Sequence, residues 1–286
     1  MADYRDLQEP SGELVSVERL RYEGKEPITE EELISIQNVD LYYEAKQDQI
    51  KALDDITFNI YRGEFICVLG PSGCGKSTLL KILAGFIKPT DGTVRLDGEL
   101  IDGIDKNRGV VFQNPPLYEW FSVRNNVNFG PRMSKVPRAE YEKLTDEYLK
   151  KVGLTEFADK KIYELSGGMR QRVSIARALI NNPEILLMDE PFGALDALTR
   201  ENMQNLTRKI WWDTGKTILF ITHDVEEALL LGSRILVLSK RPGRLIEDIQ
   251  VTFSRQIIEE GVEDIQFSEK FYKYREKLLR LINDQI

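Results

Sequence analysis

Residues 70–77, with the sequence Gly-Pro-Ser-Gly-Cys-Gly-Lys-Ser, constrain the fold of this chain more than any other segment. They match the pattern G-x-x-x-x-G-K-[ST]. The apolar run 65–69 before them is typical of a buried parallel strand, and residues 78–84 after them have a helical composition. A strand, a glycine-rich turn and a helix in this order predict an α/β domain that binds phosphate groups at a helix N-terminus.

The polar residues of this loop have distinct expected roles. Lys76 is expected to neutralise β- and γ-phosphates, and the Ser77 hydroxyl is expected to ligate Mg²⁺. Cys74 is either a reactive thiol activated by the helix N-terminus or simply a small residue that the loop tolerates. The expected nucleotide-binding residues are Gly70, Pro71, Ser72, Gly73, Cys74, Gly75, Lys76, Ser77 and Thr78.

Two acidic residues and the only histidine of the chain follow further apolar runs. Asp189 and Glu190 come directly after the run 185–188, and His223 comes after the β-branched and aromatic run 217–222. The carboxyl ends of parallel strands meet at one edge of a sheet, where α/β folds place their ligands. Asp189 could hold Mg²⁺, Glu190 could accept a proton from an attacking water, and His223 could contact a γ-phosphate.

The composition limits the classes of partner. The net charge is −8, with 39 basic and 47 acidic residues, which disfavours binding to nucleic acid or directly to anionic lipid. The two cysteines suggest a reducing compartment rather than a disulfide framework. No secretion signal is recognisable, and no apolar run reaches the roughly 18 residues that span a bilayer. We therefore expect a cytosolic protein, or one held at a membrane through another protein.

The rest of the chain divides by hydrophobic pattern. Residues 1–32 are charged, lack periodicity and are expected to form a loose extension. Residues 42–49 are expected to form a loop, and residues 241–244, Arg-Pro-Gly-Arg, a turn. Further strands are expected at 33–39, 56–60 and 235–238, and helices at 138–152, 171–181, 202–212 and 269–286.

Residues 165–172, Leu-Ser-Gly-Gly-Met-Arg-Gln-Arg, closely resemble the LSGGQ signature of the ATP-binding-cassette ATPases, with Met169 where the last Gln usually stands. The order of the other motifs agrees with this family over residues 33–245. The resemblance implies a P-loop NTPase fold of the α/β class: a mixed β-sheet core flanked by helices, an antiparallel β-subdomain and an α-helical subdomain. The implied divisions are an extension (1–32), the ATP-binding domain (33–255, with a helical subdomain at about 114–165) and a C-terminal helical tail (256–286).

The resemblance also implies roles for single residues. Tyr43 resembles the aromatic residue that stacks on adenine, with Tyr42 as the weaker alternative. Gln113 resembles the residue that reaches Mg²⁺ and the attacking water, so the implied metal ligands are Ser77, Gln113 and Asp189. Glu190 and His223 resemble the catalytic base and the histidine that contacts the γ-phosphate.

Cassettes of this family work as head-to-tail pairs, which the resemblance extends to this chain. Each ATP would lie between one chain's phosphate loop and the other chain's Ser166, Gly167 and Gly168, and Asp196 would cross the interface. The second chain could be an identical copy or a related cassette.

A single cassette without a transmembrane segment resembles the separate ATPase subunit of a bacterial importer. The strings DEPFGALDAL (189–198) and RPGR (241–244) resemble the nitrate, sulfonate and taurine group. The implied partners are transmembrane permease subunits and, indirectly, a substrate-binding protein, at the cytoplasmic face of the membrane. The aromatic segment 115–121 would contact the permease or simply pack within its subdomain. The alternatives are an exporter ATPase, an importer of another solute, a non-transport switch and a module that binds ATP without hydrolysis.

Overall fold

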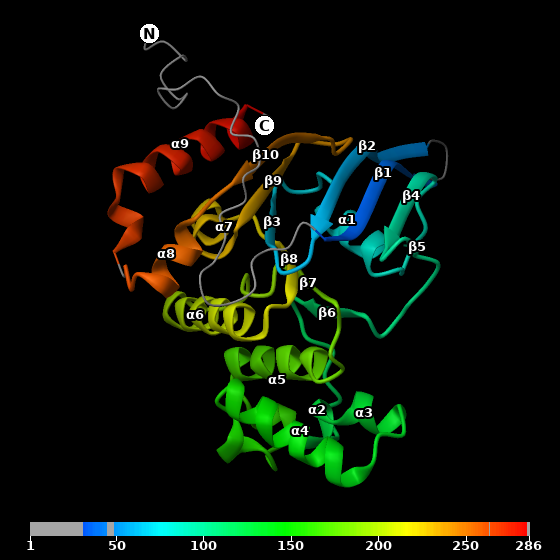
Figure 1. Ribbon diagram of the computed structural model, residues 1–286, viewed down its shortest axis with the longest axis vertical. Helices are drawn as coiled ribbons and strands as arrows, with labels where there is room; N and C mark the ends of the chain where they lie inside the picture. The colour runs from blue at the N-terminus through cyan, green and yellow to red at the C-terminus, as the bar shows by residue number, and fades with distance from the viewer. Residues whose placement is uncertain (1–30, 45–48, 263, 285–286) are drawn as a thin grey trace.

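The computed structural model describes residues 31–44, 49–262 and 264–284 of the chain (Figure 1). Its centre is a six-stranded sheet with the order β10-β9-β3-β8-β7-β6, parallel except for the antiparallel edge strand β10. These strands are β3 (Phe65–Leu69), β6 (Arg108–Phe112), β7 (Ile185–Asp189), β8 (Thr217–Ile221), β9 (Arg234–Leu238) and β10 (Leu245–Gln250). Strands β3, β8 and β9 are buried along their whole length, as their continuous apolar sequences predict.

A second, antiparallel sheet covers one side of the molecule, with the order β2-β1-β4-β5. Its strands are β1 (Glu32–Glu44), β2 (Gln49–Tyr61), β4 (Asp91–Leu96) and β5 (Glu99–Leu100). A parallel bridge between Leu53 and Gly243 links strand β2 of this sheet to the turn between β9 and β10. This link brings the turn close to the phosphate loop.

The helices form two groups (Figure 1). Helices α1, α6, α7, α8 and α9 flank the six-stranded sheet, whereas α2, α3 and α4 form a separate layer beyond α5. Their bounds are α1 Lys76–Leu83, α2 Val123–Val127, α3 Phe129–Met133, α4 Arg138–Lys151, α5 Gly167–Leu179, α6 Ala197–Thr214, α7 Val225–Leu231, α8 Phe253–Glu259 and α9 Glu269–Asn283. Single 3₁₀ turns lie at Thr155–Phe157, Ile162–Glu164 and Ile265–Phe267.

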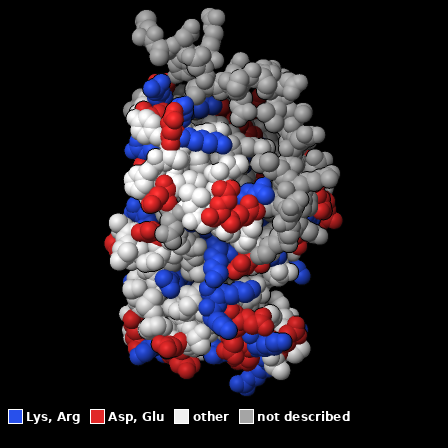
Figure 2. Space-filling model, turned by 60° about the vertical axis from the view of Figure 1, so that its left-hand side comes forward, with Lys and Arg blue, Asp and Glu red and all other residues white. Residues whose placement is uncertain are grey.

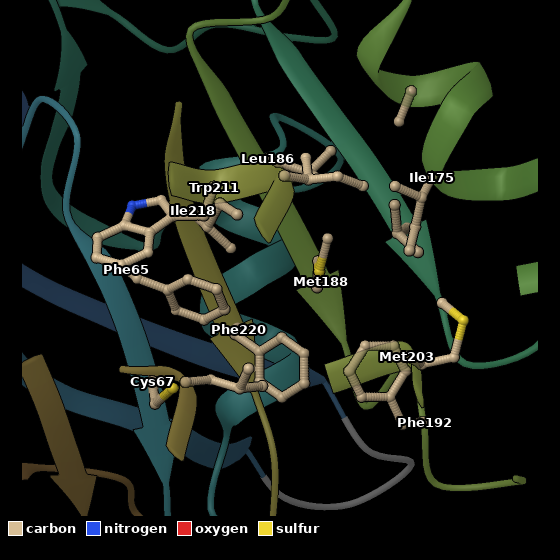
Figure 3. Close-up of a cluster of buried hydrophobic side chains, with 14 of the residues drawn as sticks. Phe65, Cys67, Ile175, Leu186, Met188, Phe192, Met203, Trp211, Ile218 and Phe220 are labelled. Atoms are coloured by element: carbon tan, nitrogen blue, oxygen red, sulfur yellow. The ribbon is translucent and has the colours of Figure 1, made fainter. Parts of the chain in front are cut away.

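Two apolar clusters fill the two faces of the six-stranded sheet. Successive residues of a strand point to opposite faces, so Ile66 and Val68 join α1 and the antiparallel sheet, while Phe65 and Cys67 join the other cluster. In Figure 3 the second cluster contains the ring of Phe65 near Trp211 and Phe220, with ring centroids 5.7 and 5.9 Å away. The sheet is therefore rigidly packed on both faces, which fixes the positions of its strand ends.

The charged surface contributes less to stability than these clusters do. On the face shown in Figure 2, acidic and basic side chains are interspersed, apart from a narrow column of Lys and Arg over the middle. Exposed ion pairs such as Arg275–Glu226, at 2.7 Å, contribute little, because water and salt screen the two charges.

The C-terminal helix α9 is amphipathic, as its sequence predicts. Phe271 and Leu278 are buried, and the ring of Phe271 lies 5.1 Å from that of Phe253 in α8. Helices α8 and α9 pack against α7, the helix that follows His223. Within the described ranges, no helix combines the length and the apolar character needed to cross a membrane.

Several sequence-based expectations are confirmed, and one is wrong. The mixed central sheet, the antiparallel sheet and the separate helical layer are present. Residues 42–44 and Gln49, however, belong to β1 and β2 rather than to a loop, because backbone pairing between the two strands continues to Glu44 and Gln49. Residues 45–48 and 1–30 lie outside the described residues, as do the last two residues of the expected tail helix.

Candidate nucleotide-binding site

The phosphate loop connects the carboxyl end of β3 to the N-terminus of α1, as expected. Gly75 precedes the helix with a φ of 103°, a left-handed conformation that favours glycine. A Cβ atom there would lie 2.6 Å from Leu53 Cδ2 and 2.9 Å from the Ala52 carbonyl oxygen. A larger residue at this position would therefore push the loop away from β2.

A cavity of about 260 Å³ opens above this loop. The loop forms one end of it and strands β1 and β2 form the other. Its lining residues are Tyr43, Ile50, Ala52, Ser72, Gly73, Gly75, Lys76, Ser77, Thr78, Glu190 and Arg241. Six of the nine expected loop residues thus face the cavity, whereas Gly70, Pro71 and Cys74 are not among its lining.

The two candidate tyrosines differ clearly in position. Tyr43 lines the cavity, and its hydroxyl lies 3.2 Å from the hydroxyl of Thr78 at the start of α1. The ring of Tyr42 lies outside the cavity lining, with the Lys51 ammonium 5.2 Å from its centre. The structure therefore favours Tyr43 over Tyr42 as the aromatic residue available to a base.

Lys76 and Cys74 are both buried in the loop. The Lys76 ammonium donates to the carbonyl oxygens of Gly70 and Pro71, at 2.7 and 3.0 Å. Cys74 is 1% exposed, and burial raises the pKa of its thiol above the usual value despite the nearby lysine. Of the two readings of Cys74, the structure favours a small packed residue, because a reactive cysteine needs an accessible, low-pKa thiol.

Ser77 and Asp189 come together at the strand ends. The Ser77 hydroxyl donates to Asp189 Oδ1 at 2.9 Å. Burial raises the pKa of the Asp189 carboxyl, the hydrogen bond from Ser77 opposes this shift, and the charge of Glu190 adds to it. A half-buried carboxylate with a raised pKa and an adjacent hydroxyl is a donor set that suits a hard divalent cation. Within the described residues, no cluster of three or more His, Cys, Asp and Glu side chains could hold a metal alone.

Glu190 and His223 meet beside this pair. His223 Nδ1 lies 3.2 Å from Glu190 Oε2, although the residues are 33 positions apart in the chain. Glu190 has a φ of 44°, and its N–H donates to the carbonyl oxygen of Ile221 at 3.0 Å. A left-handed non-glycine residue costs free energy, and such strain is concentrated at functional sites.

The segment that carries His223 is held by a buried carboxylate. The Thr222 hydroxyl and the Gln204 amide donate to Glu227, at 2.5 and 3.0 Å. Burial raises the pKa of the Glu227 carboxyl, while the two hydrogen bonds oppose the shift. These contacts fix the backbone between β8 and α7, from which His223 projects with an exposed side chain.

Other expected site residues lie away from the cavity. Gln113 follows β6 without lining the cavity; its Nε2 atom would lie 2.9 Å from a Cβ on Gly193. Ser166, Gly167 and Gly168 lie at the start of α5, and none of them lines the cavity. Within this chain the Ser166 hydroxyl acts as a helix cap, accepting from the Met169 N–H at 3.3 Å.

Asp196 is also remote from the cavity within one chain. Its carboxylate caps α6 by accepting from the Thr199 N–H at 3.0 Å, which lowers the pKa of the carboxyl. Arg241, in contrast, lines the cavity, although its sequence pattern predicted no role in nucleotide binding. The turn pattern was visible in the sequence, but its position beside the phosphate loop depends on contacts between residues about 170 apart.

Comparison with known proteins shows the family of the chain. A family model described as "ABC transporter" matches residues 53–193. The chain is 48% identical to the taurine import ATP-binding protein TauB of Jannaschia sp. over 252 residues, 88% of this chain and 94% of that protein.

Two solved structures extend the agreement to the fold. The first is a dimeric post-hydrolysis state of the ATP-binding cassette MJ0796 bound to ADP and Pi: TM-score 0.67, 36% identity, 77% of this chain and 99% of that chain. The second is cbiO1 from Clostridium perfringens, part of an ABC transporter complex: TM-score 0.71, 29% identity, 87% and 100% coverage. The chain therefore belongs to the ABC transporter family, as one of its ATP-hydrolysing cassette subunits.

Proposed function

We propose that this chain powers the import of a small solute by hydrolysing ATP, which binds in the cavity above the phosphate loop. The observation that carries the proposal is the convergence of the Lys76 loop, the Ser77–Asp189 pair and the Glu190–His223 pair at one sheet edge. The base would lie against Tyr43, Ile50 and Ala52, and the phosphates against the loop.

Glu190 acts as the general base of the reaction. Its carboxylate accepts the proton of the attacking water, and the oxygen of that water forms the bond to the γ-phosphorus as the bond to the leaving ADP oxygen breaks. His223 contacts the γ-phosphate from the same side and orients Glu190 through their contact at 3.2 Å. Gln113 positions the same water after its side chain turns from Gly193 toward the phosphates.

Ser77 and Asp189 are the residues that would hold Mg²⁺, with Gln113 as the third ligand. The bound ion would supply positive charge to the phosphate oxygens. Asp189 fits this role because its carboxylate is half-buried, so that a cation offsets the cost of its ionisation.

A second cassette, either an identical or a related chain, completes the site. The N-terminus of α5 carries Ser166 and Gly167, which are exposed, and Gly168, which is buried, and none of the three lines the cavity of its own chain. Head-to-tail pairing would place them over the partner's phosphate loop, with Asp196 crossing between the chains. Backbone N–H groups at a helix N-terminus then stabilise the γ-phosphate.

The helical layer is the proposed contact with the permease. Trp120 is 69% exposed beside a cluster of rings: Tyr118 lies 5.4 Å from it and 4.7 Å from Phe129, between centroids. Exposed aromatic rings of this kind suit a groove for a partner helix. In this arrangement residues 33–255 form the ATP-binding domain, 114–165 its helical subdomain and 256–286 a tail, with 1–32 as an extension, at the cytoplasmic face of the membrane.

The solute is proposed to be taurine or a related sulfonate, because relatives such as the Jannaschia protein are named taurine import ATP-binding proteins. A separate substrate-binding protein would deliver it to the permease. The test is uptake of labelled taurine, nitrate and an alkanesulfonate by cells that carry the complete transporter, with the Glu190→Gln variant as comparison and Lys240→Ala as control.

The proposal is supported if taurine uptake is lost in the Glu190→Gln cells but not in the Lys240→Ala cells. If uptake of another solute is lost instead, the chain still powers an importer, but taurine is not its solute. Unchanged uptake of every solute rejects ATP-driven import of this class.

A further inference from the structure

The turn between β9 and β10 is fixed against the phosphate loop by backbone contacts. The Gly243 N–H donates to the Ala52 carbonyl, and the Asp54 N–H donates to the Gly243 carbonyl, both at 2.9 Å. A Cβ atom on Gly243 would lie 2.1 Å from the Cys74 carbonyl oxygen, so only glycine allows this approach. Arg241 therefore projects from a backbone whose position relative to the loop is set.

Further contacts hold the two sides of the turn. The Ser239 hydroxyl donates to the Pro242 carbonyl oxygen at 2.9 Å, and Arg244 forms an ion pair with Asp54 of β2. The two cationic neighbours of Arg241 differ from it. Arg244 already has a carboxylate partner, and Lys240 does not line the cavity.

Arg241 reaches the phosphate end of the cavity. Its Nη2 atom lies 3.7 Å from the position that a Cβ on Gly73 would occupy. Within the part of the chain that the structure describes, its guanidinium forms no hydrogen bond or ion pair. An arginine that lines a phosphate-binding cavity and has no protein partner there is available to a ligand.

The charge balance of the cavity favours an anionic ligand group at this position. Its charged lining residues are Lys76, Arg241 and Glu190, a net charge of +1. Lys76 is 6% exposed and donates to loop carbonyls, so its charge is deep in the loop. A nucleoside triphosphate carries several negative charges, and guanidinium groups bind phosphate through paired N–H donors.

We infer that Arg241 binds the polyphosphate of the nucleotide, as a second cation beside Lys76. This inference rests on the proposed function, since it requires that ATP occupies this cavity. Arg241 is a nucleotide-binding residue here and takes no part in the transfer of the proton. Its effect is on affinity, and it increases with the number of phosphates.

The test is calorimetric binding of ATP, ADP and adenosine to the purified full-length chain in EDTA. The variants are Arg241→Ala and Arg241→Lys, with Lys240→Ala as a control that removes an adjacent exposed charge. Arg241→Ala should weaken ATP binding about tenfold, ADP binding less and adenosine binding not at all. Arg241→Lys should retain part of the affinity, Lys240→Ala should match wild type, and the loss should shrink with added salt.

Three results would overturn the inference. The first is an ATP affinity of Arg241→Ala within twofold of wild type. The second is an equal loss of affinity for adenosine, which would place the contact on the nucleoside, and the third is a loss confined to ATP-dependent pairing of chains.

The Lys76→Ala variant distinguishes failure of this inference from failure of the proposed function. If wild type binds ATP and Lys76→Ala does not, an unchanged Arg241→Ala variant rejects only the role of Arg241. If wild type itself binds no ATP, the proposed function fails.

Discussion

Two substitutions of Glu190 should separate its chemistry from its backbone strain. In Glu190→Gln, the amide keeps the size of the side chain and can still accept from His223, but it cannot take a proton from water. General-base catalysis contributes about 10²–10⁴-fold, or about 2.7–5.4 kcal/mol of activation free energy, which sets the expected loss of turnover. The φ of 44° is unchanged, so the free energy of unfolding should stay within about 0.5 kcal/mol of wild type.

Glu190→Gly should lose the same catalytic contribution but gain stability. The left-handed backbone costs a non-glycine residue about 1–2 kcal/mol, whereas glycine's extra freedom in the unfolded chain costs about 0.5–1 kcal/mol. The net change expected lies between no effect and a stabilisation of about 1.5 kcal/mol. Phosphate release measures turnover, urea unfolding measures stability, and gel filtration with ATP shows whether Glu190→Gln still pairs.

Hydrolysis of ATP by Glu190→Gln within threefold of the wild-type rate would contradict the role of Glu190 as general base. So would a Glu190→Gln variant that stays monomeric with ATP while its turnover persists. A Glu190→Gly variant less stable than Glu190→Gln would show that the strain argument is wrong.

Three further predictions follow from the contacts. Lys76→Ala should lower ATP affinity more than tenfold by calorimetry, because it removes the buried cation of the loop. Gly168→Ala would place a Cβ 2.4 Å from Thr199 Cγ2 and should cost about 1–3 kcal/mol in urea unfolding, whereas Gly167→Ala should cost under about 0.5 kcal/mol. Burial raises the pKa of Asp189 in the folded state above its unfolded-state value of about 3.9. The free energy of unfolding therefore falls as the pH rises from about 3.9 through the folded-state pKa, because the folded chain must ionise a buried carboxyl. Asp189→Asn should therefore raise the free energy of unfolding in EDTA at pH 7, and pH-dependent urea unfolding should show this gain vanish below about pH 4.

The parts of the site that depend on local sequence were predictable. The strand 65–69, the glycine loop and the acidic and histidine strand ends are specified by short runs, and parallel pairing brings those ends to one edge. The expected strands and helices around them are present, but β2 begins seven residues before its expected start at 56, and α6 begins five residues before its expected start at 202.

The parts that depend on distant pairing were not predictable from one sequence. Strand β4 includes Asp91 and Gly92, residues typical of turns, and is a strand only because β1 pairs with it. Tyr42 and Tyr43 precede a polar run that reads as a loop, yet pairing with β2 extends the strand past them. Arg241 reaches the cavity through contacts of its turn with β2 and with the loop, which no local pattern reports.

If each ATP site is shared between two chains, two variants that damage opposite halves of the site should complement each other when mixed. Lys76→Ala removes the cation of the phosphate loop. Gly167→Asp puts a carboxylate at the exposed start of α5, where a Cβ meets only Leu195 Cδ2 at 3.6 Å, so the fold should tolerate it.

Either variant alone should hydrolyse ATP poorly, since every site in its own pairs is defective. In an equal mixture, pairs of unlike chains contain one intact site, and phosphate release should recover to about a quarter of the wild-type rate. Recovery of this size is expected if the two chains share each site. Near wild-type hydrolysis by Gly167→Asp alone, or a mixture no more active than its components, would contradict a shared site.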